Sequence, residues 1–279
     1  MTRQQLAGQI KTKQSYLCVG LDTDPARIPP HLLSHADPVF EFNKQIIDAT
    51  KEFCVGYKIN TAFYEARGAR GWESMEKTVH HIPATHFRIA DAKRGDIGNT
   101  SAQYAKAFFE TLPFDAITVA PYMGEDSVRP FLEYKDKWTI LLGLTSNAGA
   151  ADFELQRAGE EYLYEKVLKT ASGWGTPDNL MFVIGATQSS WLEGIRRLAP
   201  QHFYLVPGVG AQGGSLKEIS EKAMIADVGL LVNVSRAIIY ASAGEDFAGR
   251  AALEAVRYRE EMRILLHSSR SQGSPLHSR

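Results

Sequence analysis

The chain has 279 residues, of which 44% are hydrophobic and 23% charged, an ordinary globular composition that excludes collagen, a coiled coil and a disordered chain. The 31 basic residues nearly balance the 32 acidic ones, so no overall positive charge would attract the protein to nucleic acid or to a membrane surface. The N-terminal segment has no apolar stretch typical of a signal peptide, and no apolar run approaches the roughly 18 residues of a membrane span. We therefore expect a soluble protein with no nucleic-acid or membrane partner.

The cysteines and histidines point away from a disulfide or a metal site. Cys18 and Cys54 each lie alone in an apolar run, without the CxxC spacing of a metal or redox site. The eight histidines form no HExxH or HxH arrangement. We therefore expect no metal, and a reducing compartment, which is the cytoplasm.

Short apolar or β-branched runs alternate with longer stretches of helical spacing along the whole chain. A first helix is expected at Gln4–Lys13, and helices at Val39–Phe53, Asn99–Glu110 and Glu160–Ala171 fall between the predicted strands. The predicted strands are Tyr16–Leu21, Val55–Asn60, Phe87–Ala92, Ala116–Ala120, Thr139–Leu144, Leu180–Ile184, Phe203–Val206 and Leu230–Val234. Eight βα units in about 250 residues predict a single-domain (β/α)8 TIM barrel rather than an open doubly wound sheet. We expect the barrel, with its N-terminal helix, to cover residues 1–266, and the polar segment 267–279 to be a disordered tail.

The third predicted strand ends in a dense group of charges. Because side chains alternate along a strand, Asp91 and Lys93 share one face with Phe87 and Ile89. A solvated ion pair at a strand end would give the same spacing. The carboxyl end of a barrel strand is, however, where catalytic groups lie, and this position favours a functional pair.

A lysine also interrupts the second predicted strand, which both of its neighbours should cover. A buried lysine is costly unless it is paired, so we expect Lys58 to find a carboxylate, with Asp91 on the adjacent strand as the nearest candidate. The first strand ends similarly in Asp22 and Asp24. For Asp24, which precedes Pro25, a helix cap or Asx turn is the better interpretation.

Two consecutive loops near the C-terminus have the character of a phosphate site. The seventh predicted strand is followed by a glycine-rich turn over residues 207–215, whose backbone N–H groups could approach an anion closely. Its G-x-G-x-x-G pattern is a weak match to dinucleotide folds, because it follows a late strand rather than the first one. After the eighth strand, Ser235 and Arg236 stand where a helix begins, and arginine adds a charged contact to phosphate. Ser146, just after the fifth strand, lacks a nearby histidine and would donate hydrogen bonds rather than act as a nucleophile.

Taken together, these segments resemble the orotidine 5'-phosphate decarboxylase family. Residues 89–100, IADAKRGDIGNT, resemble its signature D-x-K-x-x-D-I-x-x-T after a hydrophobic strand. Further segments match its other site segments in the same order: Leu21-Asp22, Tyr57-Lys58, Thr145-Ser146, 207–212 and Ser235-Arg236. The stretch after Ser146 and the chain length are similar to the longer bacterial members.

The resemblance implies a homodimeric barrel that converts orotidine 5'-monophosphate (OMP) to UMP and CO2 without a cofactor. It implies that Lys93 protonates C6 of the pyrimidine, that Asp91 lies against the departing carboxylate, and that Lys58 and Asp96 complete the charged network. Phosphate contacts are implied for Gln212 and Arg236, ribose contacts for Asp22 and Lys58, and a contact with the pyrimidine amide edge for Ser146. Asp96, Ile97 and Thr100 would reach the neighbouring subunit's site. Pro207, Gly208 and Ser235 complete the expected substrate-binding set.

Two other functions compete with this one. A sister enzyme of the same barrel group would act on a sugar phosphate with Mg²⁺, as a decarboxylase or an aldolase, and would need an acidic metal ligand at the end of the second strand. The sequence has Lys58 there, which would repel the metal. A phosphate-binding regulator would have lost the charged residues, whereas Lys58, Asp91, Lys93 and Asp96 are all present.

Overall fold

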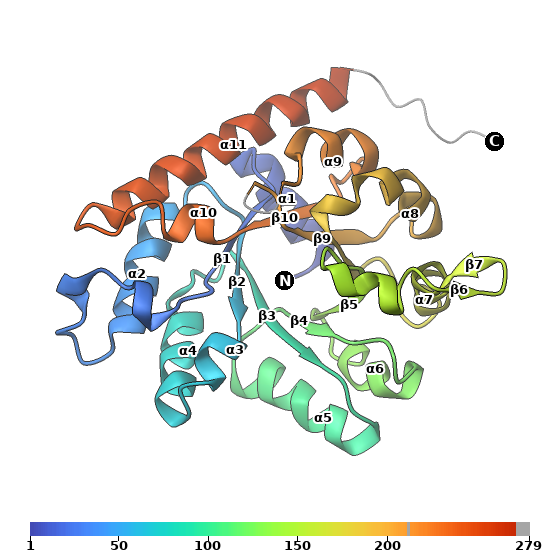
Figure 1. Cartoon of the computed structure of the whole chain (residues 1–279), viewed down its shortest axis with the longest axis horizontal. Coiled ribbons are helices and arrows are strands. Elements are labelled where there is room, and N and C mark those ends of the chain that lie inside the picture. Colours follow the sequence, from blue (N-terminus) through green and yellow to red (C-terminus); the bar gives the residue numbers. More distant parts are fainter. Residues whose placement is uncertain (211–212, 272–279) are drawn as a thin grey trace.

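Eight parallel strands form a closed barrel surrounded by helices in the computed structural model, which describes residues 1–210 and 213–271 (Figure 1). Around the barrel the order is β1-β10-β9-β8-β5-β4-β3-β2. The strands are β1 (Leu17–Gly20), β2 (Gly56–Asn60), β3 (Phe87–Arg94), β4 (Ala116–Val119), β5 (Trp138–Leu144), β8 (Leu180–Ile184), β9 (Phe203–Pro207) and β10 (Leu230–Val234). Each of the eight predicted strands overlaps one of these, which confirms the (β/α)8 barrel.

Helices form the outer layer of the barrel (Figure 1). They are α1 (Arg3–Lys13), α2 (Pro38–Thr50), α3 (Ala62–Glu65), α4 (Ala69–His81), α5 (Gly98–Lys106), α6 (Glu125–Leu132), α7 (Leu163–Ala171), α8 (Leu192–Leu198), α9 (Leu216–Ala223), α10 (Arg236–Ile239) and α11 (Phe247–Ser271). Short 3-10 helices are η1 (Pro25–Arg27), η2 (Pro30–Leu32), η4 (Ala148–Asp152) and η5 (Ala186–Trp191), and η3 (Ala107–Thr111) is a short π-helix. Among the helices within the described residues, none is long and apolar enough to cross a membrane.

Strand β2 illustrates why the barrel strands are apolar runs in the sequence. Helices cover the outer face of a parallel barrel and side chains fill its interior, so both faces of a strand are buried. Tyr57 faces outward, where its hydroxyl lies 2.9 Å from Thr50 Oγ1 and donates to the carbonyl of Ile47 in α2 at 3.1 Å. The next residue, Lys58, therefore faces the barrel interior. Alternation along β2 thus brings a charged side chain to the carboxyl end of the barrel.

Several predicted boundaries were wrong, and the helix expected over Val39–Phe53, for example, ends at Thr50. The helix expected over Glu160–Ala171 begins at Leu163, because residues 157–162 form a hairpin of β6 (Arg157–Ala158) and β7 (Glu161–Tyr162). Gly159, with φ of +79°, permits its tight turn. Residues 267–271 of the segment expected to be a disordered tail are helical, since α11 continues to Ser271. Residues 272–279 of that predicted tail lie outside the described part of the chain.

Candidate active site

Lys58 and Asp91 form a buried ion pair inside the carboxyl end of the barrel. Strands β2 and β3 pair in parallel with Asn60 opposite Asp91, which brings the lysine ammonium to the carboxylate of the neighbouring strand. The distance from Lys58 Nζ to Asp91 Oδ2 is 2.7 Å, and the side chains are only 5% and 10% exposed. The pairing expected from the sequence is therefore confirmed.

The two charges hold each other in the ionised state. Burial by itself would raise the pKa of Asp91, but the ammonium groups of Lys58 and Lys93 outweigh it and hold that pKa well below its usual range. Burial would likewise lower the pKa of Lys58, and the carboxylates of Asp91 and Asp22 outweigh it and raise that pKa. At neutral pH the site thus contains a fixed negative charge beside a fixed positive one.

Lys93 joins the same pair from its other side. Its Nζ lies 2.5 Å from Asp91 Oδ1, while about half of the lysine side chain remains exposed toward the barrel opening. Simple strand alternation does not hold this far, because the pairing of β3 with β4 shifts between Ala90 and Arg94. Lys93 also has φ of +46°, a left-handed conformation that costs a non-glycine residue about 1 to 2 kcal/mol. Such strain is concentrated at functional sites in proteins.

Asp22 extends the group into a line of alternating charges. Its Oδ1 lies 3.6 Å from Lys58 Nζ, so the order is Asp22, Lys58, Asp91, Lys93. That Oδ1 atom is buried and has no hydrogen-bond partner as far as the structure describes the chain. A ligand hydroxyl could satisfy it. Asp24, by contrast, caps η1 by accepting from Ala26 N at 2.9 Å, as expected.

The loops after β9 and β10 lie side by side, because Pro207 pairs with Asn233. Gly208 and Gly210 have φ of +97° and +76°, left-handed values that glycine adopts without strain. The Arg236 side chain is exposed at the start of α10 and makes no ion pair or hydrogen bond within residues 1–210 and 213–271. An exposed, uncompensated guanidinium beside a glycine-rich loop suits an anion.

Ser235, which was also expected at the phosphate site, forms a hydrogen bond within the fold. The Ser235 hydroxyl donates to the carbonyl of Gly20 at 3.1 Å, so it fastens β10 to β1. Gln212 lies outside the described residues.

Ser146 lies where expected, just after β5, and its surroundings include Glu154, which the sequence analysis did not single out. The Ser146 hydroxyl is sheltered and has no partner among the described residues, which leaves it available to a ligand. A Cβ on Gly185 would lie 2.1 Å from that hydroxyl, so only glycine fits there. Glu154 accepts from Thr145 N at 2.7 Å and from Thr145 Oγ1 at 2.8 Å, which anchors the residue before Ser146. A glutamate within a polar loop gives no sequence signal of that role.

The loop after β3 does not join the charged line of its own barrel. Asp96 accepts from Ile97 N at 2.8 Å and forms no ion pair in the part of the chain that the structure describes. Ile97 and Thr100 are exposed. Ser101 holds the loop by donating to the carbonyls of Asp96 and Ser127 at 2.6 and 2.9 Å. Hydrogen bonds of Ser101 thus hold the Asp96 segment, and Asp96 forms no ion pair with Lys93 of its own chain within the described residues.

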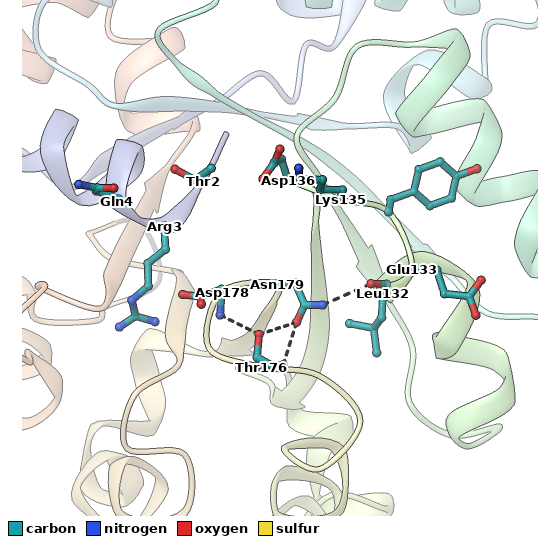
Figure 2. A pocket seen from close by; sticks show the side chains of 11 residues that line it. Thr2, Arg3, Gln4, Leu132, Glu133, Lys135, Asp136, Thr176, Asp178 and Asn179 are labelled. Atoms are coloured by element: carbon teal, nitrogen blue, oxygen red, sulfur yellow. Dashed lines mark hydrogen bonds between the residues drawn. The ribbon is translucent and has the colours of Figure 1, made fainter.

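A cavity of about 460 Å³ lies at the end of the barrel opposite the charged line. Figure 2 shows its walls, which come from the start of α1 and from the loops that precede β5 and β8. Asn179 there donates to the carbonyl of Leu132 and accepts from Thr176, which are ordinary loop contacts. This cavity is separate from the charged line at the carboxyl ends of the strands.

Within the described residues, no group of three or more His, Cys, Asp or Glu side chains could hold a metal ion.

Comparison with known proteins adds a second, independent observation. A family model described as "Orotidine 5'-phosphate decarboxylase / HUMPS family" matches residues 15–251. A Christiangramia forsetii protein named orotidine 5'-phosphate decarboxylase is 57% identical over 265 residues, covering 94% of this chain and 97% of that protein. A Flavobacterium johnsoniae protein of the same name is 56% identical over 271 residues, covering 96% and 99%. The solved structure of Leishmania donovani OMP decarboxylase is similar with a TM-score of 0.80 at 38% identity, covering 95% of this chain and 99% of that one.

Proposed function

The chain belongs to the orotidine 5'-phosphate decarboxylase / HUMPS family, and from that membership we propose that it converts OMP to UMP and CO2 without a metal or organic cofactor. The observation that carries the proposal is the line of alternating charges formed by Asp22, Lys58, Asp91 and Lys93 at the barrel opening. A magnesium-dependent sister activity is disfavoured, because the Lys58 ammonium would repel a cation there.

The chemistry requires a cation and a proton donor at one carbon atom. When the bond between C6 and the carboxylate breaks, CO2 leaves and the electron pair remains on C6 in the plane of the ring, where the π-system cannot delocalise it. The Lys93 ammonium stabilises that charge and then donates its proton to C6, giving UMP and a neutral amine that solvent reprotonates. Asp91 lies beside the departing carboxylate and fixes the position of the Lys93 ammonium.

The rest of the nucleotide would be held by groups that take no part in the bond cleavage. Arg236, Gln212 and the backbone at Pro207 and Gly208 would bind the phosphate. Asp22 and Lys58 would bind ribose hydroxyls, and Ser146 the amide edge of the pyrimidine. Within the described residues, the buried Oδ1 of Asp22 and hydroxyl of Ser146 lack a hydrogen-bond partner, which supports these two contacts. Binding energy from such remote groups can position the reacting carbon against Lys93.

The active form would be a homodimer whose two sites are shared. In this arrangement Asp96, Ile97 and Thr100 of one subunit complete the site of the other across a two-fold axis. Exposed apolar side chains on neighbouring loops support such an interface: Ile97 after β3 is 58% exposed, and Tyr122 and Met123 after β4 are 87% and 46% exposed. The absence of an ion pair between Asp96 and Lys93 of its own chain, among the described residues, fits a contact of Asp96 with a second copy.

Ultraviolet absorbance of OMP tests the activity. The pure protein, treated with EDTA, should change the spectrum of OMP to that of UMP at a rate that added Mg²⁺ does not raise. An unchanged spectrum at saturating OMP would contradict the proposed function. Turnover of a sugar phosphate that requires Mg²⁺ would favour the sister enzyme instead.

Exchange of subunits between two inactive variants tests the shared site. A Lys93→Ala homodimer and an Asp96→Ala homodimer should each be nearly inactive. In a mixed dimer one site carries both substitutions, while the other has native Lys93 from one subunit and native Asp96 from its partner. Random exchange makes half of the dimers mixed, so activity should return to about a quarter of the wild-type rate. Verified mixed dimers without recovered activity would show that Asp96 acts within its own subunit.

A cytoplasmic location is also proposed, and the unpaired, buried Cys18 and Cys54 support it. Fractionation of source cells would test it, and enrichment in a membrane or exported fraction would contradict it.

A further inference from the structure

Strands β3 and β4 lose their regular pairing next to the charged line. Ala90 pairs with Ile117, and the next pair is Arg94 with Val119. Three residues of β3, Asp91 to Lys93, therefore lie opposite a single residue of β4, which is Thr118. A bulge of this kind leaves ladder groups without their regular partners.

The Thr118 hydroxyl supplies the contacts that the bulge removes. It accepts a hydrogen bond from the backbone N–H of Lys93 at 2.9 Å and donates one to Asp91 Oδ1 at 3.1 Å. The same Oδ1 atom receives the Lys93 ammonium at 2.5 Å. Thr118 is only 1% exposed, so water does not compete for these bonds. One hydroxyl thus holds both the backbone that carries Lys93 and the carboxylate that faces its ammonium.

The direction of these bonds follows from the chemistry of the groups. A hydroxyl has one proton, and an ionised carboxylate can only accept, so Thr118 must donate to Asp91 and accept from Lys93 N. Both bonds can form at once in this arrangement alone. The left-handed backbone of Lys93, with φ of +46°, needs such a local contact, because the regular ladder does not hold it.

We propose that Thr118 is a positioning residue, whose hydroxyl fixes the Lys93 ammonium and the Asp91 carboxylate in the geometry that the decarboxylation requires. This role rests on the function proposed above. Thr118 acts through its two neighbours and takes no proton from the substrate.

Replacement of Thr118 by valine tests the role, because valine keeps the branched shape and removes both hydrogen bonds. We expect kcat for OMP to fall by about 10- to 100-fold, since small displacements of reacting groups have effects of that size. KM for OMP and the affinity for UMP should change less than about threefold, because the phosphate and base contacts lie on other strands. Thr118→Ser keeps the hydroxyl and should restore kcat to within about threefold of wild type.

Thr139 provides the matched control. It is a fully buried threonine on the adjacent strand β5, and its hydroxyl has no partner among the residues that the structure describes. Thr139→Val therefore removes a buried hydroxyl that positions nothing, and kcat should stay within about twofold of wild type. If Thr118→Val does not fold, Thr118→Ser and Thr118→Ala give the same comparison, since they differ only in the hydroxyl oxygen.

Hydrogen exchange of the peptide containing Lys93 gives a readout independent of turnover. Exchange at Lys93 N–H should be faster in Thr118→Val than in wild type and near the wild-type rate in Thr118→Ser. Wild-type kcat in folded Thr118→Val, or loss of activity through KM alone, would overturn the positioning role. So would a Thr118→Ser protein as slow as Thr118→Val. Failure of the wild-type protein itself to convert OMP would instead refute the proposed function, while exchange at Lys93 would still show whether the hydroxyl holds the bulge.

Discussion

Replacement of Arg236 by alanine separates the recognition of phosphate from the recognition of the nucleoside. The guanidinium is exposed at the start of α10 and has no side-chain partner in the described residues, so its removal leaves no buried group unpaired. A charge-assisted hydrogen bond contributes about 1.5 to 3 kcal/mol. At about 1.4 kcal/mol per factor of ten, Arg236→Ala should weaken UMP binding by roughly 10- to 150-fold.

Uridine lacks the phosphate, so its affinity for Arg236→Ala should be within about twofold of its affinity for wild type. Isothermal titration calorimetry of both proteins with both ligands measures the four dissociation constants. Arg250→Ala is a suitable control, because Arg250, on α11, is also exposed but pairs with Asp246 at 2.9 Å. It should leave the affinity for UMP unchanged. Equal losses for UMP and uridine in Arg236→Ala would refute the phosphate assignment and give Arg236 a structural role.

Three further predictions follow from the same geometry. Lys93→Ala should abolish turnover while its affinity for UMP stays within about tenfold of wild type. If circular dichroism shows that the variant is unfolded, Lys93 is instead required in the fold as the partner of Asp91. Because the folded pKa of Asp91 is depressed, its charge stabilises the fold above the unfolded pKa of about 3.9, and that stabilisation is lost as the pH falls. The difference in unfolding free energy between wild type and Asp91→Asn should therefore shrink by about 1 kcal/mol from pH 5 to pH 3 in denaturant titrations, and a constant difference would argue against the ionised pair. Glu154→Gln removes one of the two oxygens that hold Thr145 and should raise KM for OMP. Glu160→Gln changes an exposed residue of the same loop and should leave KM unchanged. The same KM in Glu154→Gln as in wild type would show that the loop does not position Ser146.

The barrel and the central ion pair were predictable because burial on both faces restricts what a parallel strand can contain. Eight apolar runs separated by helical stretches identify the strands, and a lysine within one of them stands out as a group that needs a partner. Lys58 and Asp91 then meet because their strands are neighbours in the sheet. The same reasoning places the loops of Gly208 and Arg236 next to each other after the last two strands.

Other features depend on contacts that no local pattern encodes. The bulge at residues 91–93 arises from the pairing of β3 with β4, and Thr118 looks like an ordinary β-branched strand residue in the sequence. The β6–β7 hairpin interrupts a stretch whose spacing fits a helix, because the turn at Gly159 pairs Arg157 with Tyr162.

The source of the proton that C6 receives tests the central claim most directly. Protein treated with EDTA is incubated with saturating OMP in D2O, and the product is followed by proton NMR. The account predicts UMP that carries deuterium at C6, formed together with one CO2 per UMP, and no such product from Lys93→Ala. An unchanged OMP spectrum with the wild-type protein, or turnover only after addition of Mg²⁺, would contradict it.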